Sequence, residues 1–143
     1  MRFFSGYGAF LGILLLASCL APAQEPTLGF DGAKWIWHEP AVGEALHNFD
    51  AGARFFRTEL SLPESPALRS AEIAITCDNL FILYLNGRPV GESETGNDAW
   101  HRPKRFDLTS LLSPGRVVLA VEGINTVPGA SGLLVKFTAE LQD

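Results

Sequence analysis

The chain has 143 residues with 16 acidic and 11 basic side chains, so its formal net charge at pH 7 is −5. A chain of this length suits one domain. The acidic balance argues against nucleic acid or an anionic membrane surface as a partner, because both require basic patches.

The first 18 residues are typical of an export signal. Arg2 precedes the stretch FFSGYGAFLGILLLA, which is too short and too interrupted by glycine to predict a membrane-spanning helix. Residues 16–19, LASC, match a bacterial lipobox, in which Cys19 is lipidated and becomes the new N-terminus. Cleavage after Ala23, at the A-x-A pattern APA, is the alternative. We favour the lipobox because small residues directly precede the cysteine.

These two cleavage patterns predict different locations. Lipidation at Cys19 predicts an outer-membrane or cell-surface lipoprotein that contacts the membrane only through its lipid anchor. Cleavage after Ala23 predicts a periplasmic or secreted protein. With Cys19 lipidated, no internal disulfide is expected, and Cys77 is interpreted as a small core residue. Residues 19–30 are rich in Pro and Ala and predict a tether, which leaves 31–143 as the folded domain.

The pattern from Asp31 onward is that of an all-β domain. Alternation of apolar and polar residues predicts strands over 54–62, 70–77 and 133–141, and apolar runs predict central strands over 80–85 and 117–124. In the last strand the odd-numbered residues from 133 to 141 are expected to face inward. No long helix is predicted, and DLTSLLSPG forms at most one helical turn. The expected fold is a two-sheet antiparallel β-sandwich.

Two short connections separate the predicted strands around 80–85. Asn86-Gly87 indicates a tight hairpin turn, because both residues tolerate positive φ. Asp78-Asn79 leaves too few residues for a loop, and both side chains can bond nearby backbone N–H groups and close a corner. We therefore expect Asp78 to stabilise this corner rather than to bind a ligand.

Several motifs occur in a familiar order: AKWIWHEP, FFRTELSL, AEIAITCDNLFILYLNGRPVG, RFDLTSLLSPGRVVLAVEGIN and GLLVKFTAEL. Together they resemble the galactose-binding-like β-sandwich (jelly-roll) module, which accompanies bacterial rhamnosidase-type and family 2 glycoside hydrolases. The resemblance covers about residues 31–143. Family members usually lie beside a catalytic barrel, whereas the sequence ends at Asp143, so we expect a non-catalytic module.

The resemblance also implies a structural calcium ion in some members, bound by loop oxygens. Asp50, Glu44 and Glu140 are the candidate ligands, although no D-x-D-x-D-G spacing supports them. No other cofactor is expected.

Antiparallel strands would alternate the connections between two ends of the sandwich. Loops 38–53, 78–79, 91–99 and 126–131 are then expected at one end, and 63–69, 86–87 and 108–115 at the other. The first end collects most of the polar and aromatic loop residues, including His38, Asn79 and Asn125.

The segment NDAWH at 97–101 is the candidate carbohydrate-binding segment. A sugar needs an aromatic face for its C–H surface and polar groups for its hydroxyls. We assign Trp100 as the platform, at the start of the next strand, with Asn97, Asp98 and His101 as hydrogen-bonding partners. The alternative is a core tryptophan that closes the sandwich edge. Trp35 and Trp37 share a strand face and are interpreted as packing residues.

Three functions are compatible with these patterns. The first is a carbohydrate-binding module that takes a glycan or a glycoside-containing polymer. The second is a structural module that docks onto another exported protein, and the third is a glycosidase, or its accessory subunit or remnant. A glycosidase needs two carboxylates held about 5–9 Å apart, whereas Glu92, Glu94 and Asp98 share one glycine-rich loop. The G-x-S-x-G and HExxH motifs are absent, so we expect no catalysis.

Overall fold

The computed structural model describes residues 29–37 and 48–143. Several predicted features therefore lie outside the described residues, namely the predicted signal, Cys19, most of the tether, His38 and Glu44. Within the described part, no helix is long and apolar enough to cross a membrane.

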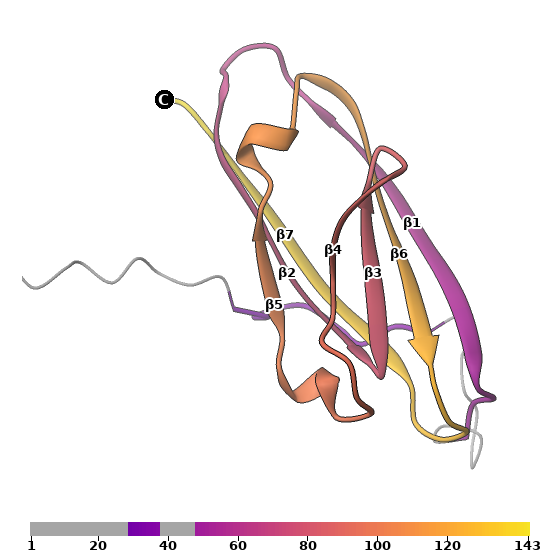
Figure 1. Ribbon diagram of the computed structural model, residues 1–143. Coiled ribbons are helices and arrows are strands. Elements are labelled where there is room, and N and C mark those ends of the chain that lie inside the picture. Colours follow the sequence, from indigo (N-terminus) through magenta and orange to yellow (C-terminus); the bar gives the residue numbers. More distant parts are fainter. Residues whose placement is uncertain (1–28, 38–47) are drawn as a thin grey trace, which may run out of the picture.

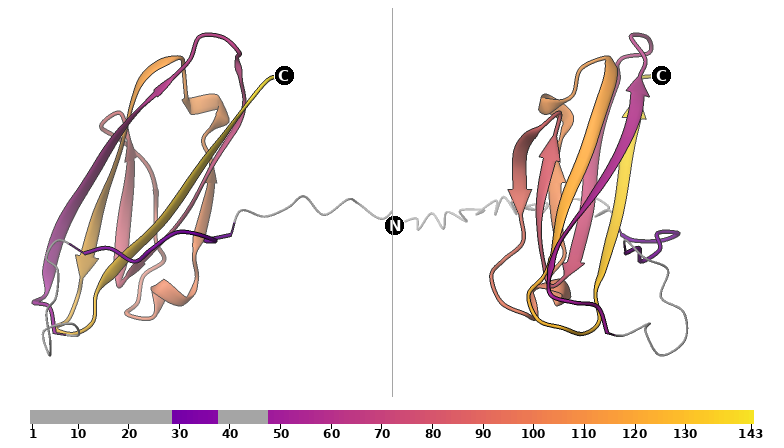
Figure 2. Two further views of the ribbon diagram at one scale, coloured as in Figure 1. Left: turned by 180° about the vertical axis from the view of Figure 1, so that it is seen from behind. Right: turned by 90° about the vertical axis from the view of Figure 1, so that its right-hand side faces the viewer.

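The chain folds into two antiparallel sheets that pack face to face (Figures 1 and 2). One sheet has the strand order β1-β6-β3-β4 and the other β5-β2-β7. The all-β, two-sheet antiparallel sandwich of the jelly-roll class is confirmed. The strands are β1 (Gly52–Leu62), β2 (Leu68–Asp78), β3 (Leu80–Leu85), β4 (Arg88–Glu92), β5 (Lys104–Asp107), β6 (Gly115–Asn125) and β7 (Gly132–Leu141).

The five predicted strands are all present, and most extend by one or two residues at their ends. The sequence patterns missed β4 and β5, because β4 contains Pro89 and Gly91 and β5 is only four residues long. The helices in the described part are the single 3-10 turns η2 (Ala99–His101) and η3 (Thr109–Leu111). The second of these confirms the single turn predicted in DLTSLLSPG.

The core lies between the sheets and is built from the inward-facing residues of β2, β3 and β6. Ile73, Ile75 and Leu83 have no exposed surface. Cys77 is also buried, and burial raises the pKa of its thiol to about 12, so its predicted role as a core residue is confirmed. In β7 the inward pattern fails at Ala139, which is exposed because β7 is the edge strand of its sheet.

The two N-terminal tryptophans lie in different environments, although the sequence predicted packing for both. Trp37 packs against the core and contacts the rings of Phe49 and Phe56, at centroid distances of 6.3 and 5.6 Å. Trp35 is 49% exposed, and its ring lies close to Gly132. Trp37 is therefore the tryptophan that stabilises the core.

The connections divide between two ends of the sandwich, as the strand directions predicted (Figure 1). We call the first the corner end, with residues 48–51, 78–79, 93–103 and 126–131. The second is the hairpin end, with residues 63–67, 86–87 and 108–114. The Asn86-Gly87 turn is confirmed, with φ values of 50° and 81°. The Asn86 side-chain oxygen accepts a hydrogen bond from the Val118 N–H at 2.8 Å.

Candidate functional site

Asn79 is the centre of the corner end. Its side chain is buried, and the N–H of Thr126 donates to its Oδ1 at 2.9 Å. Its Nδ2 donates to the carbonyl of Asn97 at 3.0 Å, and its backbone N–H donates to Ile124 at 3.1 Å. One amide side chain therefore joins three segments that are distant in sequence.

Asp78 does not make the backbone hydrogen bonds that the sequence predicted for it. Its carboxylate accepts a hydrogen bond from Asn79 Nδ2 at 2.6 Å, and no backbone donor to it is found among the described residues. The capping role predicted for Asp78 falls instead to Asn79, because an amide both donates and accepts. Partial burial raises the pKa of Asp78, and the nearby His101 opposes this shift. Asp78 therefore presents a partly buried carboxylate that is within electrostatic range of His101.

Thr126 and Asn97 complete the connection between the loops. The Thr126 hydroxyl lies 2.8 Å from Asn79 Oδ1 and 2.7 Å from Asn97 Oδ1. A hydroxyl carries one proton and can donate to one of these oxygens at a time. The Asn97 amide is exposed, so a polar ligand can compete for it at little cost.

Trp100 and His101 form a stacked pair next to this connection. Their ring centroids are 3.5 Å apart with an angle of 29° between the ring planes. The Trp100 carbonyl accepts a hydrogen bond from the buried Thr76 hydroxyl at 2.7 Å. Trp100 lies in η2 rather than at the start of a strand, since β5 begins at Lys104. Its ring is half-buried and is not part of the buried core.

Asp98 is exposed, and Arg102 holds its carboxylate with bonds of 3.0 and 3.2 Å. Arg102 also donates to Glu94 at 2.7 Å, and Lys104 contacts the other Glu94 oxygen. These cations lower the pKa values of both carboxyl groups. The sequence placed Glu94 and Asp98 in one glycine-rich loop, and the structure shows that Arg102 links the two.

Asn125 is 1% exposed and supports the start of β1. Its Nδ2 donates to the carbonyls of Phe49 and Asp50, both at 3.1 Å. Of the seven predicted binding residues, Asn79 and Asn125 are buried and hold the loops, and His38 lies outside the described residues. Asn97, Asp98, Trp100 and His101 are at the surface.

We call the surface group Asp78, Asn97, Trp100 and His101 the corner cluster. It combines a carboxylate, an amide and a pair of flat rings on a base that Asn79 and Thr126 hold together. Sequence reasoning placed Asp78 outside the binding site, because the approach of His101 depends on the fold.

The described residues contain no group of three or more His, Cys, Asp or Glu side chains suited to a metal ion. Of the calcium candidates, Asp50 precedes β1 at the corner end. Glu140 lies near the end of β7 at the hairpin end, where Ser70 donates to it at 3.3 Å. These two residues cannot share one site.

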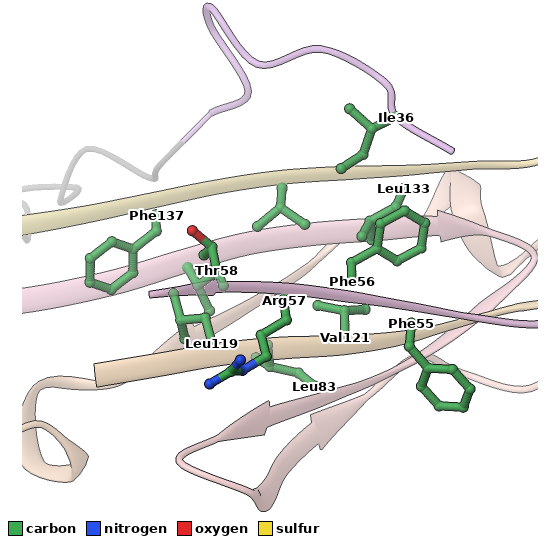
Figure 3. A pocket seen from close by; sticks show the side chains of 12 residues that line it. Ile36, Phe55, Phe56, Arg57, Thr58, Leu83, Leu119, Val121, Leu133 and Phe137 are labelled. Atoms are coloured by element: carbon green, nitrogen blue, oxygen red, sulfur yellow. The ribbon is translucent and has the colours of Figure 1, made fainter. Parts of the chain in front are cut away.

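A second concave feature lies along the side of the sandwich. A groove of about 560 Å³ opens between β1 and β7, the facing edge strands of the two sheets (Figure 3). Figure 3 shows Phe56 and Thr58 pointing toward Leu133 and Phe137 across it. Its lining is almost entirely apolar, which suits protein side chains better than sugar hydroxyls.

No protein-family model and no curated protein matches the chain. Several solved structures do. An α-L-rhamnosidase from Streptomyces avermitilis, solved with L-rhamnose, matches with a TM-score of 0.68 and 28% identity over 77% of this chain and 10% of that one. A GH78 rhamnosidase of Bacillus sp. GL1 matches with a TM-score of 0.59 and 25% identity, over 76% of this chain and 12% of that one.

A lectin from the fungus Pleurotus ostreatus matches with a TM-score of 0.62 and 20% identity, over 82% of this chain and 34% of that one. The chain thus spans about a tenth of the rhamnosidases and a third of the lectin. Both the strand topology and these matches correspond to the fold that the motifs predicted. The chain therefore forms a galactose-binding-like β-sandwich module.

Proposed function

We propose that the protein is an exported, non-catalytic carbohydrate-binding module whose ligand binds at the corner cluster. The observation that supports this most strongly is the stacked pair of Trp100 and His101 at the surface, near the Asp78 and Asn97 positions that Asn79 links. Sugar recognition needs both an apolar flat surface and a few well-placed polar groups. The corner cluster offers both on one preorganised base.

Each residue of the corner cluster has a distinct role in this proposal. Asp78 accepts hydrogen bonds from sugar hydroxyls with the lone pairs that Asn79 leaves free. Asn97 supplies a donor and an acceptor, and the Trp100–His101 pair contacts the C–H face of the ring. Asp98 contributes indirectly, since Arg102 holds its carboxylate and so fixes the loop beside Trp100.

The resting arrangement limits the entropic cost of binding. Asn79 already joins the segments at 78, 97 and 126, and Thr76 holds the backbone at Trp100. Groups held in place before binding lose little freedom when the ligand arrives. The structural matches to sugar-cleaving enzymes and a lectin support a carbohydrate as the ligand class.

A binding role fits the acidic groups better than a hydrolytic one. A glycosidase needs one carboxyl group that stays protonated as general acid and a second that is ionised. Arg102 and Lys104 lower the pKa of Glu94, and Arg102 lowers that of Asp98. Arg102 engages both of these carboxylates at once, so neither is free to serve as the ionised catalytic group.

Export and anchoring complete the proposal. The lipobox at 16–19 would place the module on a membrane surface through Cys19, and cleavage after Ala23 would release it. Replacing Cys19 with Ala should move the protein from the membrane fraction to the soluble exported fraction. An unchanged distribution would assign cleavage to the Ala23 site.

A glycan array, followed by calorimetry with L-rhamnose and galactose, tests the binding proposal. We expect the protein to bind a defined set of glycans and the Asp78→Asn variant to lose that binding, because an amide cannot replace both carboxylate oxygens as acceptors. Asp107→Asn, at the far end of β5, is the matched control and should bind as the wild type does. Equal binding by the Asp78 and Asp107 variants would refute the site.

The docking alternative is favoured by one observation, the apolar groove between β1 and β7. If the protein binds no glycan on the array, an interaction module becomes the leading function.

A further inference from the structure

We propose that β1 is a self-association edge, on which a second copy of this chain pairs its own β1 in antiparallel orientation about Thr58. β1 is the outer strand of its sheet, and in the described part of the chain no strand pairs with its outer edge. It is eleven residues long and includes Phe55, which is 78% exposed. A long edge strand presents unpaired N–H and C=O groups that can pair with another chain.

The backbone register shows which groups of β1 are available. Asn86 donates to Val118, so Val118 and alternate residues of β6 direct their hydrogen bonds toward β3. The intervening residues of β6, such as Leu119, direct theirs toward β1, where Thr58 is the partner of Leu119. The N–H and C=O groups of the odd-numbered β1 residues, including Arg57 and Glu59, therefore point to the free edge.

The sequence of β1 is self-complementary about Thr58. Antiparallel pairing with Thr58 opposite itself places Arg57 of each copy opposite Glu59 of the other, as pairs that exchange both backbone hydrogen bonds. The same register places Phe56 opposite Leu60. Opposite charges and apolar pairs stabilise such cross-strand positions, whereas like charges directly opposite destabilise them.

Neighbouring registers lack this match. Centring the pair on Arg57 or on Glu59 puts that residue opposite its own copy, which places like charges together. Both side chains are exposed, Arg57 by 58% and Glu59 by 43%, and within one copy Glu59 already pairs with Arg57 and Arg116, so the dimer exchanges one partner of Glu59 for another. Charge complementarity therefore selects both the partner, which is a second copy, and the register.

The apolar groove lies beside the free edge of β1, between β1 and β7. All four of Phe55, Phe56, Arg57 and Thr58 line the groove, and Figure 3 shows Phe56 and Thr58 pointing toward β7 while Phe55 and Arg57 alternate with them on the other side of β1. A two-fold axis through Thr58, perpendicular to the sheet, brings the second copy's groove beside the first. Phe56 and Phe137 of both copies then line one shared apolar interior, which removes exposed apolar surface from water.

The charges provide the first test, on protein purified after expression of the full chain. Light scattering across a concentration series should show a dimer for the wild type. Arg57→Glu and Glu59→Arg should each raise the dissociation constant by about tenfold or more, because each places like charges across the interface. An equimolar mixture of the two variants restores both opposite-charge pairs and should form a heterodimer. Wild-type protein that stays monomeric, or variants that dimerise like the wild type, would overturn the proposal.

Cross-linking tests the register independently. Facing Cα atoms in a non-hydrogen-bonded pair lie about 4.5 Å apart, which is within the range of a disulfide. Thr58→Cys should therefore form a disulfide-linked dimer under mild oxidation. Ser61→Cys is the matched control, because in this register its two copies lie roughly 20 Å apart. Equal cross-linking of both variants, or of neither, would contradict pairing about Thr58.

Discussion

The two ends of the sandwich use polar residues in different ways. At the hairpin end each of two polar side chains bonds one neighbouring element, as when Asn86 accepts from Val118 and the Thr109 hydroxyl accepts from the Ala71 N–H. At the corner end Asn79 joins three distant segments, and the corner cluster remains exposed above it. Polar groups beyond those needed to close the loops are the ones available for a ligand.

Two tryptophans near the corner end also differ, because one packs against the core and the other lies at the surface. Trp37 packs against the core near the corner end. Its ring approaches Gly123 in β6 and contacts the rings of Phe49 and Phe56. Trp100 lies outside the buried core, where its ring stacks on His101. Trp37 is therefore expected to contribute to stability, whereas Trp100 is the tryptophan proposed for binding.

Trp37→Ala should produce the largest effect. Truncating a core aromatic residue costs about 3–5 kcal/mol of unfolding free energy, and the loss should appear as a lower midpoint in urea denaturation. Trp35→Ala is the matched comparison and should cost clearly less, because that ring is half-exposed. A larger loss for Trp35 would reverse the assignment of the core tryptophan.

Asn79→Ala and Asn86→Ala compare one asparagine from each end. Removing the Asn79 side chain breaks its bonds to Thr126 and Asn97, and each such bond contributes about 0.5–1.5 kcal/mol. Asn86→Ala should cost about 1 kcal/mol, mainly because alanine tolerates positive φ less well. Thermal unfolding of both variants measures the difference. Similar losses would mean that Asn79 is no more than a local turn residue.

Trp100→Ala should weaken glycan binding at least several-fold and leave the fold intact. Aromatic contacts of this kind contribute on the order of 1 kcal/mol beyond the area they bury. Phe55→Ala is the control, since Phe55 is an exposed aromatic residue on β1, away from the corner cluster. Far-UV circular dichroism would separate lost binding from lost structure. If Trp100→Ala unfolds the protein, Trp100 is a core residue and cannot be assigned to binding.

The smallest expected effect is the change of stability and of glycan binding with pH as Asp78 ionises. Burial raises the pKa of Asp78. Its carboxyl group therefore ionises at a higher pH than that of an ordinary aspartate, whose pKa is about 3.9. Ionisation of this partly buried group disfavours folding, so its contribution to stability is present at low pH and declines as pH rises through the raised pKa. Glycan binding should increase over the same range, because the ionised carboxylate accepts hydroxyl groups. Calorimetry at several pH values should show this increase, and Asp78→Asn should abolish it.

The sequence predicted the sandwich and the grouping of the loops because strand periodicity and strand direction are local properties. Alternation in 54–62 and the apolar run at 80–85 became β1 and β3, and from these the two ends follow. The roles of Asp78 and Asn79 could not be separated in this way. Both can close a corner, and the choice depends on Asn97 and Thr126, which approach only in the folded chain.

The tryptophans show the same limit of local patterns. Trp35 and Trp37 share the same spacing, and the structure distinguishes them through distant glycines. Gly123 leaves room for Trp37 in the core, while Trp35 lies over Gly132 near the surface. Trp100 follows a loop whose acidic residues Arg102 holds in place, a contact that the spacing did not predict.

Backbone amide chemical shifts during a glycan titration test the central claim most directly. With the strongest glycan from the array as the probe, the account predicts shifts concentrated at 78–79, 97–101 and 126, with little change at 63–67, 86–87 and 108–114. Shifts concentrated at the hairpin end, or along the groove between β1 and β7, would contradict a binding site at the corner cluster.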